Sequence, residues 1–385
     1  MNSFEFYNPV NILFGKEQLS RISELIPAGK KIMLLYGGGS IKRNGVYGRI
    51  KEALSGRTMV EFGGIEPNPS YETCMEAVER IKSEKVEFLL AAGGGSVIDA
   101  TKFISAAALY ENGDQWDILA KGAVVERALP LATVLTLPAT GTEMNKNAVI
   151  SRKSTTDKRA FGSPHVFPQF SVLLPDAAAS LPKNQVANGI VDAFIHTTEQ
   201  YLNYVVNAPI QDRFAESVLK TLIEEGPKVY ADPADYEAMS NLFWSATMAL
   251  NGLLSCGVPG DWSVHTIGHE LTALHNIDHA CTLAIVLPGI LTVLKEEKMD
   301  KLVQYGERVW GISEGTGAER ADLAIRKTEE FFRSLDVKTR LGEYGVGKET
   351  VDKIVNRFVE RNWIAFGDRK LVTPEVIRKV LESRL

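Results

Sequence analysis

The sequence lacks clusters of basic residues and long uncharged stretches, and each absence excludes a class of protein. Lys and Arg are spread along the chain without forming a basic block, and the formal net charge is −5. Because binding to nucleic acid depends on clustered positive charge, we expect no nucleic-acid partner. No uncharged stretch approaches the roughly 20 residues of a membrane span. We therefore expect no membrane partner either.

Cysteine is also scarce. The three cysteines, Cys74, Cys256 and Cys281, are far apart and odd in number, which does not indicate a disulfide framework. The N-terminal segment shows neither the basic leader nor the apolar core of a signal peptide. The sequence thus favours the reducing cytoplasm. For Cys281 a soft metal ligand is one interpretation, and a small buried thiol is the other.

Histidine is rare as well, but it is concentrated. Four of the six histidines fall within fifteen residues: His265, His269, His275 and His279. A fifth, His196, follows Asp192 by four residues, so on a helix the carboxylate and the imidazole share one face. One carboxylate with two or three imidazoles can hold a divalent metal and leave a coordination position open. We therefore predict a catalytic metal, the alternative being a helix with partly exposed histidines.

Geometry limits how these histidines meet. On one continuous helix His265 and His279 would lie roughly 21 Å apart along the axis and could not share an ion. Asn276-Ile277-Asp278 is typical of a helix end, so the chain can turn there and return His279 to His265. His265 and His269 are four residues apart and face the same way.

The length of 385 residues is enough for two domains, and the pattern changes near residue 180. Before that point, buried apolar runs such as 31–36, 86–92 and 129–137 alternate with glycine turns and amphipathic helices. This predicts an α/β dinucleotide-binding domain with a mostly parallel, Rossmann-like sheet over residues 1–180. Over residues 181–385 long helical patterns dominate and glycine thins out, which predicts an all-helical metal-binding domain. We expect the charges on its helices to solvate outer faces.

Two glycine turns follow predicted strands. Gly93-Gly94-Gly95-Ser96 leads into a helix that carries Asp99 and Lys102, the layout in which backbone N–H groups receive a pyrophosphate. A purely structural turn is the alternative, because this is not the G-x-G-x-x-G fingerprint. The loop Pro138–Thr142 ends a neighbouring strand, and ligands of open α/β sheets gather at such ends.

The other turn bears on which dinucleotide is bound. Sites that prefer NAD usually place an acid near the adenosine ribose, where it repels a 2′-phosphate. Here the turn offers Gly37, Gly38, Gly39 and Ser40, followed by Lys42 and Arg43, and no acid. The sequence therefore predicts NADP(H) in preference to NAD(H).

Five motifs carry a specific resemblance and span nearly the whole chain: residues 62–69 (FGGIEPNP), 93–102 (GGGSVIDATK), 135–143 (LTLPATGTE), 188–201 (NGIVDAFIHTTEQY) and 265–280 (HTIGHELTALHNIDHA). With them the chain resembles the iron-containing (group III) alcohol dehydrogenases, above all the bacterial NADPH-dependent aldehyde reductases and butanol dehydrogenases. The resemblance implies the metal ligands Asp192, His196, His265 and His279, with Fe²⁺ or Zn²⁺ as the metal. It also implies that His269 lies near the nicotinamide, where it relays a proton or orders water, and that the protein is a homodimer.

The resemblance assigns cofactor contacts along the first half of the chain. The residues that it places at the pyrophosphate and ribose are Gly94, Gly95, Ser96 and Asp99, with Asn68 near the adenosine half, Thr136, Thr140 and Thr142 along the nicotinamide, and Lys158 at the ribose. Gly38 and Ser40 correspond to positions where relatives that prefer NAD carry a discriminating Asp. The loop PATGTE is shorter than in most relatives. His275 has no counterpart and is expected either to pack against its neighbours or to contact a metal ligand without binding the metal.

The expected reaction is hydride transfer between NADP(H) and an aldehyde or primary alcohol bound to the metal. One alternative enzyme is a dehydroquinate-synthase-like lyase, which also uses NAD and a metal. It would need Lys and Arg near the metal, whereas residues 261–287 contain none. A non-catalytic metal or nucleotide sensor is the other alternative, although structural zinc sites are usually closed by four Cys or His ligands.

Overall fold

The structure, a computed structural model, describes residues 1–385 and contains two compact units. The unit that we call the sheet unit comprises Tyr7–Leu181 and Asp232–Thr247. The helical unit comprises Met1–Phe6, Pro182–Ala231 and Met248–Leu385. The domain boundary at residue 180 stays a prediction.

The sheet unit is built on six strands, all parallel to their neighbours. In their order across the sheet they are β1 (Asn11–Phe14), β8 (Phe170–Leu173), β5 (Leu131–Leu135), β4 (Phe88–Gly93), β2 (Ile32–Tyr36) and β3 (Met59–Phe62). All six residues of β4 are buried, as expected of a strand covered on both faces. The predicted mostly parallel sheet is confirmed.

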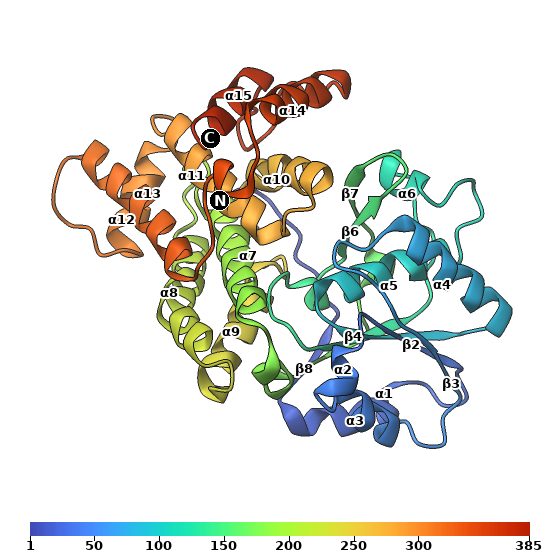
Figure 1. Cartoon of the computed structure of the whole chain (residues 1–385). Coiled ribbons are helices and arrows are strands. Elements are labelled where there is room, and N and C mark those ends of the chain that lie inside the picture. Colours follow the sequence, from blue (N-terminus) through green and yellow to red (C-terminus); the bar gives the residue numbers. More distant parts are fainter. The chain divides into compact units, whose positions relative to one another are not determined.

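Helices cover both faces of this sheet (Figure 1). On one face α5 (Gly95–Ala107) packs on β4 and β5, and α4 (Tyr71–Glu84) packs on α5. On the other face the buried side chains of α1 (Ile22–Leu25), α2 (Ser40–Arg43) and α3 (Val46–Ala53) form one apolar cluster with alternate residues of the strands. This arrangement gives the strands two apolar faces and leaves their carboxyl ends open to ligands.

The sheet unit also contains elements outside the main sheet. They are α6 (Asp117–Ala120), most of α9 (Tyr236–Ala249), the antiparallel hairpin of β6 (Asn147–Arg152) and β7 (Asp157–Gly162), and 3-10 helices at Lys16–Arg21, Thr142–Met144, Pro164–Val166 and Pro175–Ser180. Strand β6 packs on α5.

The helical unit is formed by α7 (Lys183–Tyr201), α8 (Pro209–Ala231), α10 (Ser263–His275), α11 (His279–Val293), α12 (Met299–Arg308), α13 (Gly317–Ser334), α14 (Lys348–Glu360) and α15 (Pro374–Glu382), with a 3-10 turn at Gly342–Tyr344. Helix α11 is apolar on all sides and contacts α7, α10, α13 and α15, so it is the central helix of this unit. Its first residue is His279.

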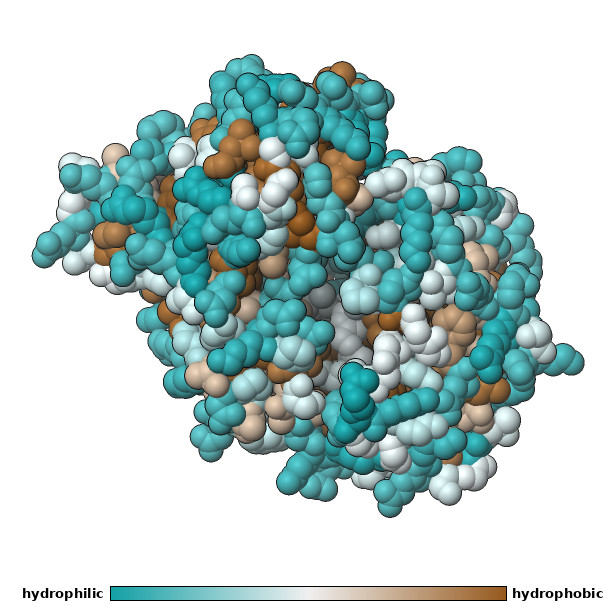
Figure 2. Space-filling model, in the orientation of Figure 1, coloured by the Kyte–Doolittle hydropathy of each residue, from teal (hydrophilic) through white to brown (hydrophobic).

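Hydrophilic side chains cover most of the face shown in Figure 2, and apolar areas lie between them. Exposed charges on α13 and α14 lie opposite their buried apolar residues, as the charge pattern predicts. In no helix is an apolar stretch long enough to cross a bilayer.

Candidate metal centre and cofactor-binding edge

Three helices of the helical unit bring an acid and three imidazoles together. Helix α7 carries Asp192 and His196 one turn apart, α10 carries His265, and α11 begins with His279. The Nε2 atoms of the three histidines lie around one oxygen, Asp192 Oδ1. The distances are 3.8 Å from His196 and 3.9 Å from both His265 and His279. Two donor atoms that share an ion at about 2.1 Å lie at most ~4.2 Å apart, so these separations suit one cation.

Asp192, His265 and His279 form the tightest part of this arrangement, because one donor atom from each lies within 4.8 Å of the others. His196 joins it through Asp192, and its ring stacks on that of His265 with 4.6 Å between centroids. The four side chains that the sequence singles out therefore meet at one place.

The turn between α10 and α11 is what allows the meeting. Helix α10 ends at His275, and Asn276 takes a left-handed conformation with φ of 53°. Asp278 then precedes α11, and its Oδ2 accepts a hydrogen bond of 2.9 Å from Asn188 of α7. The chain reverses within three residues, as the sequence predicts, and the ring centroids of His265 and His279 lie 5.3 Å apart.

A carboxylate that the sequence analysis missed also belongs to this cluster. Glu199 of α7 contacts Nδ1 of His265 through Oε2 and accepts the backbone N–H of Val264 at 2.7 Å through Oε1. It is 3% exposed. Its only signal in the sequence is its position on the helix face of Asp192, seven residues further along.

The electrostatics of the cluster fit a cation. Asp192 Oδ1 is buried and makes no hydrogen bond, although three imidazole nitrogens surround it. Burial lowers the pKa of His196 to about 4, so its ring is uncharged at neutral pH, as a metal ligand must be. Burial also raises the pKa of Glu199 to about 8. A positive charge placed among these groups would satisfy the bare oxygen and favour both carboxylates in their ionised form.

His269, His275 and Cys281 lie outside the set of four proposed ligands. His269 is half-buried, with its ring centroid 5.1 Å from that of His279 and 6.3 Å from that of His265. His275 is exposed, and its Nε2 shares a hydrogen bond of 2.9 Å with Thr350 Oγ1. The thiol of Cys281 contacts Asn188 Oδ1 at 3.5 Å, and burial raises its pKa.

In the sheet unit, the predicted cofactor residues gather at the carboxyl ends of three neighbouring parallel strands. Gly37, Gly38 and Ser40 follow β2, Gly94, Gly95 and Ser96 follow β4, and Thr136 follows β5. Helix α5 begins at Gly95, and its N-cap Gly94 has no side chain to accept the first N–H groups. These strand ends share one edge, where open α/β sheets bind their ligands.

The glycines of the two turns are not equivalent. A Cβ at Gly95 would lie 2.6 Å from Thr140, and one at Gly93 would lie 2.8 Å from Val97, so packing alone requires glycine there. Gly38 differs: a Cβ would meet nothing within 4 Å, and its φ is not in the left-handed range. The fold therefore does not require glycine at position 38.

A buried polar network fixes the loop that ends in Thr142. Lys102 of α5 is fully buried, and its Nζ donates to Thr142 O at 2.6 Å, Thr142 Oγ1 at 2.7 Å, Asn147 O at 2.8 Å and Asn145 Oδ1 at 3.0 Å. Asp99 accepts hydrogen bonds from Thr142 Oγ1 at 2.6 Å and from the Val149 N–H at 2.9 Å. Both of its oxygens are therefore held within the protein.

Lys158 and Asn68, predicted at the ribose and the adenosine, also lie together. Lys158 Nζ on β7 donates to Asn68 Oδ1 at 2.9 Å, and both residues are half-buried. Asn68 has φ of 53°, a left-handed conformation that asparagine tolerates better than most residues.

An acid lies near the first glycine turn, although the turn itself has none. Glu61 of β3 accepts hydrogen bonds from Tyr47 at 2.6 Å and Tyr36 at 3.2 Å, and it lies 3.7 Å from Lys42 Nζ. The Lys42 ammonium also lies over both tyrosine rings, 4.8 and 5.0 Å from their centroids. The Tyr36 hydrogen bond and the nearby carboxylate raise the pKa of Lys42. A cation is thus held two residues from Ser40, on the short helix that the turn begins.

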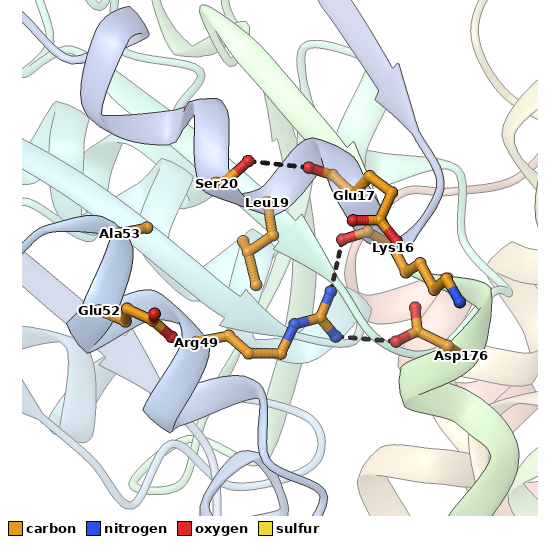
Figure 3. Close-up of a pocket in the computed structure, with 8 residues that line it drawn as sticks. All are labelled: Lys16, Glu17, Leu19, Ser20, Arg49, Glu52, Ala53 and Asp176. Atoms are coloured by element: carbon orange, nitrogen blue, oxygen red, sulfur yellow. Dashed lines mark hydrogen bonds and ion pairs between the residues drawn. The ribbon is translucent and has the colours of Figure 1, made fainter.

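A cavity of about 650 Å³ in the sheet unit lies apart from all predicted site residues. Figure 3 shows its lining, in which Arg49 is bound by Asp176 at 2.8 Å and by the carbonyl of Lys16 at 2.6 Å. Its other charged side chains include Lys16, Glu17 and Glu52. The arginine of this cavity is therefore already paired within the protein.

A parallel sheet with glycine turns at its strand ends, in one chain with an acid and three imidazoles around a common point, defines a metal-dependent oxidoreductase of the dinucleotide-binding class. Residues 9–175 match the iron-containing alcohol dehydrogenases, and residues 186–385 match the C-terminal part of the same family. The chain belongs to the iron-containing alcohol dehydrogenase family.

Comparisons with individual proteins and solved structures point to the same family. The chain is 51% identical to the NADPH-dependent aldehyde reductase YqhD of Escherichia coli (strain K12), over all of both chains. It is 41% identical to the probable NADH-dependent butanol dehydrogenase 1 of Bacillus subtilis (strain 168), again over all of both. The crystal structure of Escherichia coli YqhD matches with a TM-score of 0.98 at 50% identity, covering 100% of this chain and 99% of that one. The NADH-dependent butanol dehydrogenase A of Thermotoga maritima matches with a TM-score of 0.95 at 38% identity and the same coverage. The predicted family is confirmed, and none of these findings supports the lyase or sensor alternatives.

Proposed function

We propose that this chain reduces aldehydes to primary alcohols, reversibly, with NADPH as its preferred hydride donor and one divalent ion at Asp192, His196, His265 and His279. The observation that carries the proposal is the placement of three imidazole Nε2 atoms 3.8–3.9 Å from one bare carboxylate oxygen. When bound, Fe²⁺ or Zn²⁺ would supply Lewis-acid polarisation of the substrate oxygen. The name of the Escherichia coli relative, an NADPH-dependent aldehyde reductase, supports this substrate class.

The chain's own residues have distinct tasks in this proposal. Asp192 supplies the one negative charge among the ligands, and the neutral His196 leaves that charge uncompensated for the ion. His269, beside His279, is our proposed source of the proton that the alkoxide product needs, delivered from an imidazole nitrogen. The turn Gly94–Ser96 and the N-terminus of α5 are proposed to bind the pyrophosphate and so orient the nicotinamide.

Two features at the first glycine turn support NADPH. Gly38 is exposed and has no structural reason to be glycine, so its missing side chain leaves room beside the ribose. Lys42 brings a positive charge to the same turn. A 2′-phosphate would gain from both, whereas NADH needs neither. Names of other relatives include NADH-dependent enzymes, so this preference has to be measured.

The test is a side-by-side assay. Aldehyde-dependent oxidation of NADPH and of NADH is measured before and after removal of metal with a chelator, and again after Fe²⁺ or Zn²⁺ is restored. We expect faster turnover with NADPH at subsaturating cofactor, loss of activity without metal and recovery with it. Full activity in protein shown to be free of metal would refute the proposed role of the ion.

We also propose a cytoplasmic homodimer. The three cysteines are free thiols, which agrees with a reducing compartment. Strand β1 is an edge strand, and the exposed ring of its last residue, Phe14, packs edge-to-face on that of Trp244 at 6.4 Å. An open edge with exposed aromatic rings is suited to a second copy of the chain. Light scattering on purified protein distinguishes dimer from monomer.

A further inference from the structure

We propose that Glu199 is the positioning residue of the metal centre: it fixes the ring of His265 so that Nε2 of this ring faces the ion. The inference rests on the proposed metal site and goes beyond it, because Glu199 is not a ligand in that site. It follows from three contacts that one carboxylate makes with a single helix.

The first two contacts are with the backbone at the beginning of α10. Trp262, the N-cap, has a left-handed conformation and provides no side-chain cap. Glu199, which lies on α7, caps the helix instead. It accepts hydrogen bonds from the N–H of Val264 at 2.7 Å and from that of His265 at 3.4 Å. Because a helix N-terminus favours negative charge, these bonds hold the carboxylate and the first turn of α10 in one place.

The third contact is with the His265 side chain. The same Oε2 that faces the His265 N–H also contacts Nδ1 of its ring. An imidazole whose Nδ1–H donates to a carboxylate has its lone pair on Nε2, and its rotation about χ2 is restricted. Nε2 of His265 points to the cluster, 3.9 Å from Asp192 Oδ1. Backbone and ring are thus fixed by one group.

Glu199 also links the two halves of the ligand set. It lies on the face of α7 that carries Asp192 and His196, so ligands from α7 and α10 share one rigid connection. The Glu199 carbonyl accepts the Asp261 N–H at 2.9 Å, just before α10 begins. In the absence of this link, His265 would have to be ordered when the ion binds, and that ordering would weaken binding.

A purely structural role makes a different prediction. If Glu199 only capped α10, replacing it would lower stability, and the affinity and geometry of the metal site in the folded protein would not change. The matched control is Glu216 of α8, another buried carboxylate of the helical unit, which accepts hydrogen bonds from Tyr201 at 2.9 Å and Arg308 at 3.0 Å. Glu216→Gln removes a buried charge without touching the metal ligands.

The experiment compares wild type, Glu199→Gln and Glu216→Gln. Zn²⁺ affinity is measured by competition with a chromogenic chelator, and the site geometry by the visible absorption spectrum of the Co²⁺-loaded protein. We expect Glu199→Gln to bind Zn²⁺ about 10- to 100-fold more weakly and to change the Co²⁺ spectrum, whereas Glu216→Gln changes neither. Wild-type affinity and spectrum in folded Glu199→Gln would overturn the proposal.

A second measurement uses only the wild type and decides the matter if Glu199→Gln does not fold. In the Zn²⁺-loaded protein with ¹⁵N-labelled histidine, NMR shows which ring nitrogen of His265 carries the proton. We expect Nδ1–H with Nε2 bound to the ion, and the reverse assignment would overturn the proposal. Failure of the metal site itself gives a separate result, because the wild type would then bind no Zn²⁺ at all.

Discussion

Lys102 Nζ donates a hydrogen bond of 2.7 Å to Thr142 Oγ1, and Thr142 Oγ1 in turn donates to Asp99 at 2.6 Å. The relay joins a fully buried amine on α5 to the loop that carries the predicted nicotinamide contacts. The position of this loop therefore depends on a residue that has no proposed contact with the cofactor.

Lys102→Met is expected to lower the free energy of unfolding by about 3 kcal/mol, because the four oxygens that accept hydrogen bonds from Lys102 Nζ lose their donor. Urea unfolding of the metal-free protein measures this. Lys31→Met, which breaks a partly exposed pair with Glu84, is the control and should cost at most about 1 kcal/mol. Equal effects of the two substitutions would contradict the importance of the network.

The loss of stability in Lys102→Met should also depend on pH, because Lys102 itself titrates. Burial lowers the pKa of Lys102 to about 7, while the unfolded chain keeps the ordinary value near 10.5. Between these pH values the unfolded state binds more protons, so the stability of wild type relative to Lys102→Met should rise from pH 7 toward pH 10. A constant difference over this range would show that the buried amine stays charged.

Gly38→Asp is expected to change the cofactor preference. A Cβ there meets open space, so the variant should fold, and its carboxylate would repel a 2′-phosphate while bonding a 2′-hydroxyl. We expect the ratio of kcat/KM for NADPH to that for NADH to fall at least about tenfold, which is about 1.4 kcal/mol. Gly48→Asp on α3, also in open space, is the control. An unchanged ratio would mean that the 2′-phosphate is recognised elsewhere.

Gly95→Ala tests the second glycine turn. The new Cβ would lie 2.6 Å from both Cγ2 and Oγ1 of Thr140, so the loop must move away from α5. We expect the dissociation constant of NADPH to increase roughly tenfold, since positioning at this turn is sensitive to small displacements. Adding Thr140→Gly removes the clashing atoms and should restore part of the affinity. Isothermal titration calorimetry measures both, and unchanged binding in Gly95→Ala would exclude close contact at this turn.

His269→Ala separates proton transfer from metal binding. The variant should retain its ion, because the proposed ligands are intact, but kcat for aldehyde reduction should fall about 100-fold if the imidazole delivers the proton. His275→Ala, whose ring bonds Thr350, is the control and should leave kcat near the wild-type value. Loss of metal from His269→Ala would make His269 a ligand instead.

The sequence predicts those features that local pattern determines. Three strands of the sheet, β2, β4 and β5, appear in the sequence as apolar runs before turns that contain glycine, and the return of His279 to His265 follows from the helix-ending residues 276–278. The gathering of Asp192 and His196 follows from their spacing on one helix. Each of these features depends on residues close together in the chain.

The groups that the sequence does not reveal act over long separations. Glu199 contacts His265 across 66 residues, and in the sequence it resembles any charge on a helix face. Glu61 reaches the first glycine turn from the neighbouring strand β3, so a turn without acids still has a carboxylate nearby. Such partners depend on the packing of helices and strands, which residue spacing alone does not specify.

The central claim is that one divalent ion sits among Asp192, His196, His265 and His279. Elemental analysis of the purified wild type and of His265→Ala by plasma mass spectrometry, after dialysis without chelator, tests it most directly. We predict about one equivalent of Fe²⁺ or Zn²⁺ per chain in the wild type and a marked loss, together with loss of turnover, in His265→Ala. A wild type without metal, or a His265→Ala variant that keeps both its metal and its activity, would contradict the account.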